Sequence, residues 1–140
     1  QAMLDNPWFR RKPPKSLDRY DFSGDLVSGL STEDGAATLT AFSAASIANC
    51  VDHLPKKPAT WVICGGGRHN NTLMDWIQTY LQTPVCKAED VSWRGDDLEA
   101  EAFAFLAVRS YLGLPLSLPS TTGVKSPCTG GKLYEAQRSS

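Results

Sequence analysis

The spacing of hydrophobic and polar residues predicts a long helix in the first half of the chain. After Ser31, apolar residues recur at helical spacing until two prolines, Pro55 and Pro58, end the pattern. Ser31 with Asp34 is typical of a helix start, where a serine hydroxyl binds a free backbone N–H. Many Ala and Ser residues separate the apolar positions, so another backbone can approach closely, and we expect burial. The apolar positions are Leu39, Phe42, Ile47, Val51 and Leu54.

The middle of the chain predicts two short strands that flank a helix. Residues 60–64 are apolar and rich in β-formers, and they stop at three glycines, as a buried parallel strand does where it leaves a sheet. Asn70 or Asn71 can cap the next helix. A second strand is expected at 84–87. The apolar face of the helix between them comprises Leu73, Met74, Ile77, Tyr80 and Leu81.

The two ends of the chain are less regular. Prolines in residues 6–15 disfavour a long helix there, and we expect Trp8 and Phe9 to anchor that segment to the core. A short helix is expected over 21–29, and a short strand near Leu133.

A last helix is predicted from Asp96 to about Leu112, where Gly113 and Pro115 end it. The order helix, strand, glycine turn, helix, strand, helix indicates an α/β fold. The short crossover predicts a parallel strand pair with a right-handed connection.

Composition and charge exclude several classes of function. The 140 residues suffice for one domain, and a hydrophobic fraction of 41% allows a real core. A net charge of −1 argues against nucleic acid or a membrane surface as partner. Residues 1–15 lack the apolar stretch of a secretory signal, and no run is long enough to span a bilayer. The four cysteines lack zinc-ligand spacing, so we expect reduced, mostly buried thiols and no metal site.

The segment CGGGRHN is the first candidate site. It follows a predicted strand at its carboxyl end, where ligands bind in open α/β sheets, and glycines let the backbone approach a ligand closely. It is neither a Walker A loop nor a GxGxxG motif. From the residues alone, a nucleotide contact and a tight turn without a ligand both remain open.

The acidic start of the last helix is the second candidate. At helical period, Glu99 lies among apolar residues, where a carboxylate must be paired or line a cleft. Asp96 with Glu99 also matches a capping box, which the spacing alone favours. The alternative is a carboxylate that accepts hydrogen bonds from the hydroxyls of a sugar. The apolar neighbours of Glu99 are Ala102, Phe103 and Leu106.

Four segments carry a resemblance to known kinases. WVICGGGRHNNTLMDWIQTYLQTPV is similar to the adenosine-binding segment of sugar kinases of the actin/hexokinase superfamily. Three others resemble the anhydro-N-acetylmuramic acid kinase family and cover, with the first, nearly the whole chain in order: NPWFRRKPPKSLDRYDF, EDGAATLTAFSAASIA and GDDLEAEAFAFLAVRSYLGLPLSLPSTTGV. The chain departs from that family's pattern at Leu17, Asp18 and Phe105.

The resemblance implies a fold and site residues. The fold would be one lobe of an actin/hexokinase-like (ribonuclease H-like) fold, with short parallel strands packed with helices. Residues 31–140 would form the C-terminal lobe, and residues 1–30 an irregular lead-in partly from the lobe junction. ATP would contact Gly65, Gly66 and Gly67, with Arg68 and Asn70 as neighbours. Glu99 would contact the sugar.

The resemblance also implies a reaction. Such kinases open 1,6-anhydro-N-acetylmuramic acid with water and transfer the γ-phosphoryl group of ATP to O6, with Mg²⁺, during cell-wall recycling in the bacterial cytoplasm. Their phosphate loop and catalytic aspartate belong to the N-terminal lobe, and neither motif occurs here. We therefore assign no catalytic residue to this chain and expect it to be inactive alone. Its partners would be ATP, the amino sugar and the N-terminal lobe, and a homodimer is left open.

Two other interpretations remain. The lobe could serve as a non-catalytic nucleotide-binding or interaction module. The chain could also belong to another sugar kinase of the same superfamily. An upstream phosphate loop in the reading frame would argue against the first, and substrate profiling would test the second.

Overall fold

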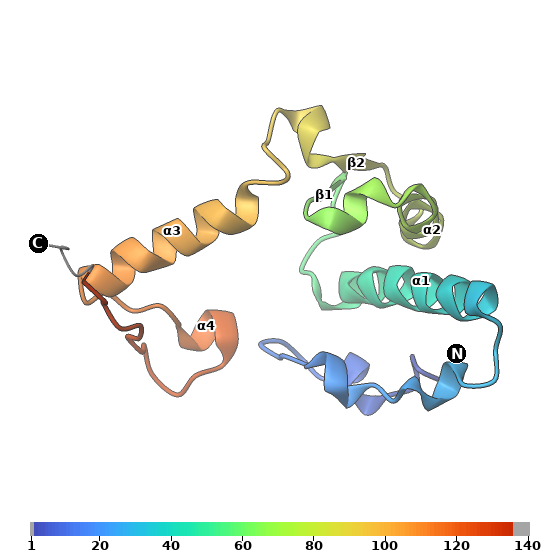
Figure 1. The fold of residues 1–140 in the computed structure, drawn as a ribbon, viewed down its shortest axis with the longest axis horizontal. Coiled ribbons are helices and arrows are strands. Elements are labelled where there is room, and N and C mark those ends of the chain that lie inside the picture. The colour runs from blue at the N-terminus through green and yellow to red at the C-terminus, as the bar shows by residue number, and fades with distance from the viewer. Residues whose placement is uncertain (1, 136–140) are drawn as a thin grey trace, which may run out of the picture. The chain divides into compact units, whose positions relative to one another are not determined.

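The computed structural model describes residues 2–135 and divides them into two compact units (Figure 1). The first unit comprises the residues up to 13 together with 17–98. The second comprises residues 14–16 and those from 99 onward. The expected division at residue 30 into a lead-in and a lobe stays a prediction.

The first unit contains two helices and two strands. Helix α1 spans Thr32–Ala48 and α2 spans Asn71–Leu81. Strands β1 and β2 span Trp61–Ile63 and Val85–Lys87. Short 3-10 turns lie around them: η1 (Pro7–Arg10), η2 (Arg19–Asp21), η3 (Gly24–Val27), η4 (Asn49–His53), η5 (Gly66–His69) and η6 (Ala88–Val91).

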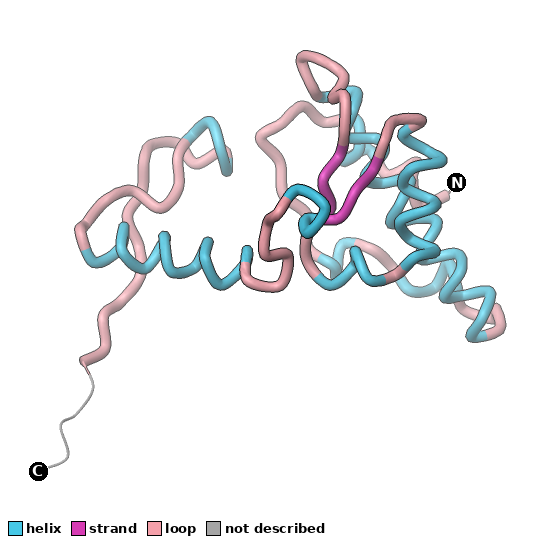
Figure 2. Tube along the Cα trace, turned by 90° about the horizontal axis from the view of Figure 1, so that it is seen from above, coloured by secondary structure: helices cyan, strands magenta, loops and turns pink. Residues whose placement is uncertain are grey.

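The two strands form a parallel pair, which Figure 2 shows side by side in magenta. Trp61 is in register with Val85, and Ile63 with Lys87. The crossover between them contains α2, so the expected α/β fold and parallel pairing are confirmed. Parallel strands end at the same edge of the sheet, so the segments after Ile63 and after Lys87 begin beside each other.

Helices α1 and α2 pack together to form the core of the first unit. Ala44, Ile77 and Leu81 are its buried members. Because Ala44 has only a methyl group, it lets α2 approach closely, as the small residues of α1 predict. Partly buried apolar side chains surround these three: Ile47, Val51, Trp61, Ile63, Leu73 and Val85.

The start and the serine content of α1 have local explanations. The Ser31 hydroxyl accepts a hydrogen bond from the Asp34 N–H at 3.0 Å, which confirms the predicted cap. Within the helix, Ser43 and Ser46 donate their hydroxyl protons to the carbonyls four residues earlier. These polar residues are thereby satisfied inside the helix.

Aromatic rings hold the lead-in segment against α1. Phe9 is buried, and its ring centroid lies 6.2 Å from that of Phe22 and 6.1 Å from that of Phe42. Phe22 and Phe42 meet edge to face at 5.1 Å. The expected anchoring role of Phe9 is confirmed.

The short helix expected over 21–29 is present only as a four-residue 3-10 helix, η3, while η2 ends at Asp21. Short polar side chains bind nearby backbone groups and compete with helical hydrogen bonds. Asp21 accepts from the Asp18 N–H at 2.8 Å, and the Ser23 hydroxyl accepts from the Asp25 N–H at 3.1 Å.

The second unit contains most of α3 (Leu98–Tyr111) and the short α4 (Pro119–Thr122). A single antiparallel bridge joins Ser117 to Cys128. The strand expected near Leu133 is wrong, since residues 129–135 form neither helix nor strand. Instead, the Ser110 hydroxyl donates to the Gly130 carbonyl at 2.6 Å and ties this segment to α3.

Helix α3 has no buried residue. The apolar face predicted from its sequence is present. Leu98 and Leu106 are partly buried, but the other large apolar side chains of the helix are more than half exposed. These exposed side chains are Phe103, Phe105, Val108 and Tyr111, and Leu112 just beyond the helix is exposed as well.

All four cysteines are free, and Cys64 and Cys128 are exposed, so the expectation of mostly buried thiols is wrong for these two. In the part of the chain that the structure describes, no helix combines the length and hydrophobicity needed to cross a membrane.

Candidate functional site

The glycine turn begins where β1 ends. Gly65 has φ 74° and ψ 174°, a conformation that is essentially restricted to glycine. Gly66 and Gly67 are exposed and open η5, and their N–H groups find no acceptor among residues 2–135. A Cβ atom at Gly66 would have no heavy atom within 4 Å. The turn therefore presents bare backbone with free donors at the carboxyl edge of the sheet.

Asn70 caps the helix after the turn. Its side-chain oxygen accepts a hydrogen bond from the Leu73 N–H at 3.1 Å, and Asn71 is the first helical residue. Of the two asparagines left open by the sequence, Asn70 is the cap. Since η5 lies between β1 and α2, α2 begins one 3-10 turn beyond the strand end.

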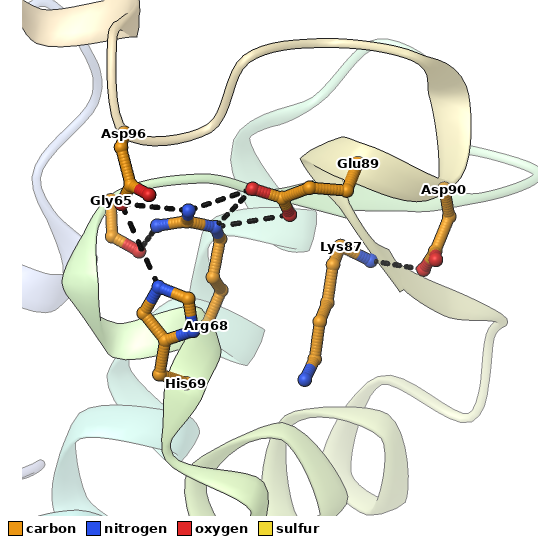
Figure 3. A network of polar contacts seen from close by, with 7 residues as sticks. All are labelled: Gly65, Arg68, His69, Lys87, Glu89, Asp90 and Asp96. Carbon is orange, nitrogen blue, oxygen red and sulfur yellow. Dashed lines mark hydrogen bonds and ion pairs between the residues drawn. The ribbon is translucent and has the colours of Figure 1, made fainter.

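Arg68 is the most completely enclosed residue of the site, with 1% of its surface exposed. Its Nε lies 2.9 Å from Oε1 of Glu89, and its Nη2 lies 2.7 Å from that same oxygen. Nη2 also lies 2.7 Å from Oδ1 of Asp96, and Nη1 donates to the Gly65 carbonyl at 2.9 Å. Figure 3 shows the guanidinium between these groups. Arg68 thus links the glycine turn to the segment after β2.

The same contacts shift the pKa values of the cluster. Hydrogen bonds from Arg68, followed by one from its own backbone N–H, lower the pKa of Glu89 to about 2. The hydrogen bond from Arg68 also lowers the pKa of Asp96. The two carboxylates raise the pKa of Arg68. All three groups are therefore charged at neutral pH.

Gly95 makes room for this cluster. It is buried, and a Cβ atom there would lie 2.5 Å from both Nε of Arg68 and Oε1 of Glu89. The requirement for glycine is steric, because only a residue without a side chain lets the backbone pass so close to the ion pairs.

Glu99 belongs to the second unit and is exposed. Helix α3 begins at Leu98, so Asp96 lies outside the cap position, and its carboxylate pairs with Arg68 instead. The capping-box interpretation of Asp96 with Glu99 is therefore wrong. Glu99 stays a candidate for ligand contact.

The described residues contain no group of three His, Cys, Asp or Glu side chains placed to hold a metal ion. The predicted nucleotide residues Gly65, Gly66, Gly67, Arg68 and Asn70 come together in one turn. Sequence reasoning missed Glu89, Gly95 and Asp96. Glu89 does have a signal: it comes just after the second predicted strand, so the parallel pairing places it at the edge where the glycine turn begins.

Comparison with known proteins identifies relatives of the chain. The family model described as anhydro-N-acetylmuramic acid kinase matches residues 1–136. A protein of that name from Rhodospirillum rubrum is 52% identical over 136 residues, 97% of this chain. Those from Rhizorhabdus wittichii and Rhizobium rhizogenes are 53% and 50% identical over 93% and 95% of the chain. The chain spans 36% of the length of each of these three relatives.

Proposed function

Because the chain belongs to the anhydro-N-acetylmuramic acid kinase family, we propose that it forms the adenosine-binding part, and a portion of the sugar site, of an ATP-dependent kinase. The proposed substrate is 1,6-anhydro-N-acetylmuramic acid. Water opens its anhydro bond and the γ-phosphoryl group of ATP passes to O6, giving N-acetylmuramic acid 6-phosphate. We place this activity in cell-wall recycling in the bacterial cytoplasm. The observation that supports it most strongly is the family match over residues 1–136.

The glycine turn fits the neutral part of a nucleotide. Gly66 leaves open space above the backbone, and the free N–H groups of Gly66 and Gly67 can donate to acceptors on a bound adenosine. The neighbouring cluster pairs one guanidinium with two carboxylates, which leaves a formal charge of −1. That charge favours adenosine over the triphosphate at this position.

Mg²⁺ and the phosphates need other ligands. Phosphoryl transfer depends on metal ions and cationic groups around the phosphates, and no metal-binding cluster occurs within residues 2–135. We therefore propose that the phosphate loop, the Mg²⁺ site and the general base lie in the remainder of a full-length kinase. This chain supplies no catalytic residue.

The sugar contact is proposed at Glu99 on α3. Its carboxylate is exposed and can accept hydrogen bonds from sugar hydroxyls. Exposed aromatic and aliphatic side chains of α3, such as Phe103 and Phe105, support the proposal that this helix packs against another part of the full-length polypeptide.

Two assays test the proposal. A full-length kinase carrying this sequence should convert Mg-ATP and the anhydro sugar into ADP and the 6-phosphate, while the 140-residue chain alone should give no turnover above background. Phosphorylation of a different sugar only would favour another kinase of the superfamily. Failure of the full-length protein to bind nucleotide would contradict the proposal, and turnover by the chain alone would contradict its lack of catalytic groups.

A further inference from the structure

We propose that Arg68 is a positioning residue, which holds the glycine turn and the segment from Glu89 to Asp96 in the geometry that binds adenosine, without touching the nucleotide itself. This inference rests on the proposed function of the turn. It differs from the expectation drawn from the sequence resemblance, in which Arg68 is a neighbour of the bound ATP.

The hydrogen-bonding capacity of Arg68 is almost used up within the chain. Nε donates to Glu89, Nη2 lies within hydrogen-bond distance of Glu89 and Asp96, and Nη1 donates to the Gly65 carbonyl. Of the five N–H groups of a guanidinium, these contacts leave one, on Nη1. Since only 1% of the residue is exposed, a phosphate has no access to it without disrupting the cluster.

The charge of the cluster also argues against a phosphate contact. The two carboxylates outnumber the single guanidinium, and both belong to exposed side chains, with 49% of Glu89 and 78% of Asp96 accessible. An approaching triphosphate would therefore meet negative charge before it could reach Arg68.

What Arg68 does hold is the first carbonyl of the turn. Gly65 adopts a backbone conformation available only to glycine, and its carbonyl accepts from both the Arg68 N–H and Nη1. These two bonds fix the peptide plane that leads into Gly66. The same guanidinium binds the far segment through Glu89 and Asp96, and Gly95 lets that segment approach.

A preorganised turn binds more tightly than a mobile one, because ordering a loop on binding consumes part of the interaction energy. Without the guanidinium, the Gly65 carbonyl would lose a partner and the segment 89–96 would lose its attachment to the turn. The free N–H groups of Gly66 and Gly67 would then no longer be held in one direction. The expected result is weaker binding of every ligand that contains adenosine.

The test measures binding of adenosine, ADP and ATP by calorimetry to a full-length kinase carrying this sequence and to two variants, Arg68→Lys and Glu89→Gln. The lysine variant keeps the charge but loses the planar fork, and the glutamine variant keeps the shape but loses the charge. We expect both variants to lower the affinity for all three ligands by the same factor, about tenfold. Losses of this size follow when residues that support a binding site are removed. The KM for the sugar and kcat at saturating ATP should stay unchanged.

The matched control is Asp97→Asn. Asp97 directly follows that segment and pairs with Arg94 at 3.2 Å, but the pair is exposed and lies outside the cluster. It should bind all three ligands as the wild type does. The double variant Arg68→Lys/Glu89→Gln should lose no more affinity than the weaker-binding single variant, since the two residues act as one unit.

Three results would overturn the proposal. Loss of ADP and ATP affinity with normal adenosine affinity would assign Arg68 to the phosphates. Normal affinity for all three ligands in both variants would leave the cluster a purely structural role. Failure of both variants to fold, detected by circular dichroism, would lead to the same conclusion. If the wild type itself binds none of the three ligands, the proposed function fails rather than the role of Arg68.

Discussion

Arg68 and Glu89 lie 21 positions apart in the chain and meet side by side, with Nε and Nη2 of the arginine both within 2.9 Å of Oε1 of the glutamate. The hydrogen bonds from Arg68 lower the pKa of Glu89 to about 2. The pair joins the turn after β1 to the segment after β2, and this link makes the acid stability of the first unit depend on Glu89.

We predict that acid weakens the first unit through loss of this pair. The folded pKa of Glu89 is about 2, below its ordinary value of 4.5. A carboxylate with a depressed folded pKa stabilises the protein above its unfolded pKa and loses that contribution as the pH falls toward the folded one. The contribution of Glu89 should therefore be fully present above about pH 4.5 and be lost toward pH 2.

Thermal melts of the wild type and Glu89→Gln from pH 7 to pH 2 measure this contribution as a difference. The two melting temperatures should converge as the pH falls below about 4.5, because the glutamine of the variant cannot titrate. A constant difference across the whole range would show that the charge of Glu89 does not support the fold.

The first two glycines of the turn should respond differently to alanine. Gly65 has φ 74° and ψ 174°, so Gly65→Ala should cost about 1–3 kcal/mol of unfolding free energy. Gly66 has a φ outside the left-handed region and open space around it, so Gly66→Ala should cost almost nothing. Urea unfolding of both variants provides the measurement. Equal losses would mean that the turn does not adopt this conformation.

We predict that Glu99→Gln lowers kcat/KM for the sugar in a full-length kinase. The substitution keeps the shape and removes the charge, and a charged hydrogen bond is worth about 1.5–3 kcal/mol, or roughly tenfold or more in rate. The melting temperature should hardly change, because Glu99 is exposed and the structure shows no capping box with Asp96.

The control is Glu101→Gln, which makes the same change two residues further along α3. Its sugar kinetics should match the wild type. Normal sugar kinetics in Glu99→Gln would remove Glu99 from the proposed site.

The sequence was most informative where local signals agreed. One of the two candidate asparagines, Asn70, caps α2, and the apolar run before the glycines forms β1, paired in parallel with β2. These features depend on capping chemistry and hydrophobic spacing, which act within a few residues. The short helix expected over 21–29 is limited to the 3-10 helix η3, because Ser and Asp side chains there bind local backbone groups.

The ion cluster could not be predicted in the same way. Its members are separated by up to 28 positions, from Arg68 to Asp96, and a loop brings them together. Asp96 matched a capping motif in the sequence, but a buried guanidinium attracts its carboxylate more strongly than an exposed helix end does. The apolar face of α3 was predicted correctly as a pattern, yet several of its large side chains, among them Phe103 and Phe105, are exposed in this chain.

The most direct test of the account is the effect of Gly66→Val on the kinetics of a full-length kinase carrying this sequence. The chain has room for the new side chain, since no heavy atom lies within 4 Å of a Cβ at Gly66. The valine side chain would occupy space that a bound adenosine needs. The KM for ATP should therefore rise by roughly tenfold or more, which corresponds to about 1.4 kcal/mol of lost binding free energy. The KM for the sugar should stay near the wild-type value. Gly35→Val, an equally open site on α1, should change neither constant. Unchanged ATP kinetics in Gly66→Val, or an equal effect on both substrates, would contradict the assignment of the glycine turn to adenosine.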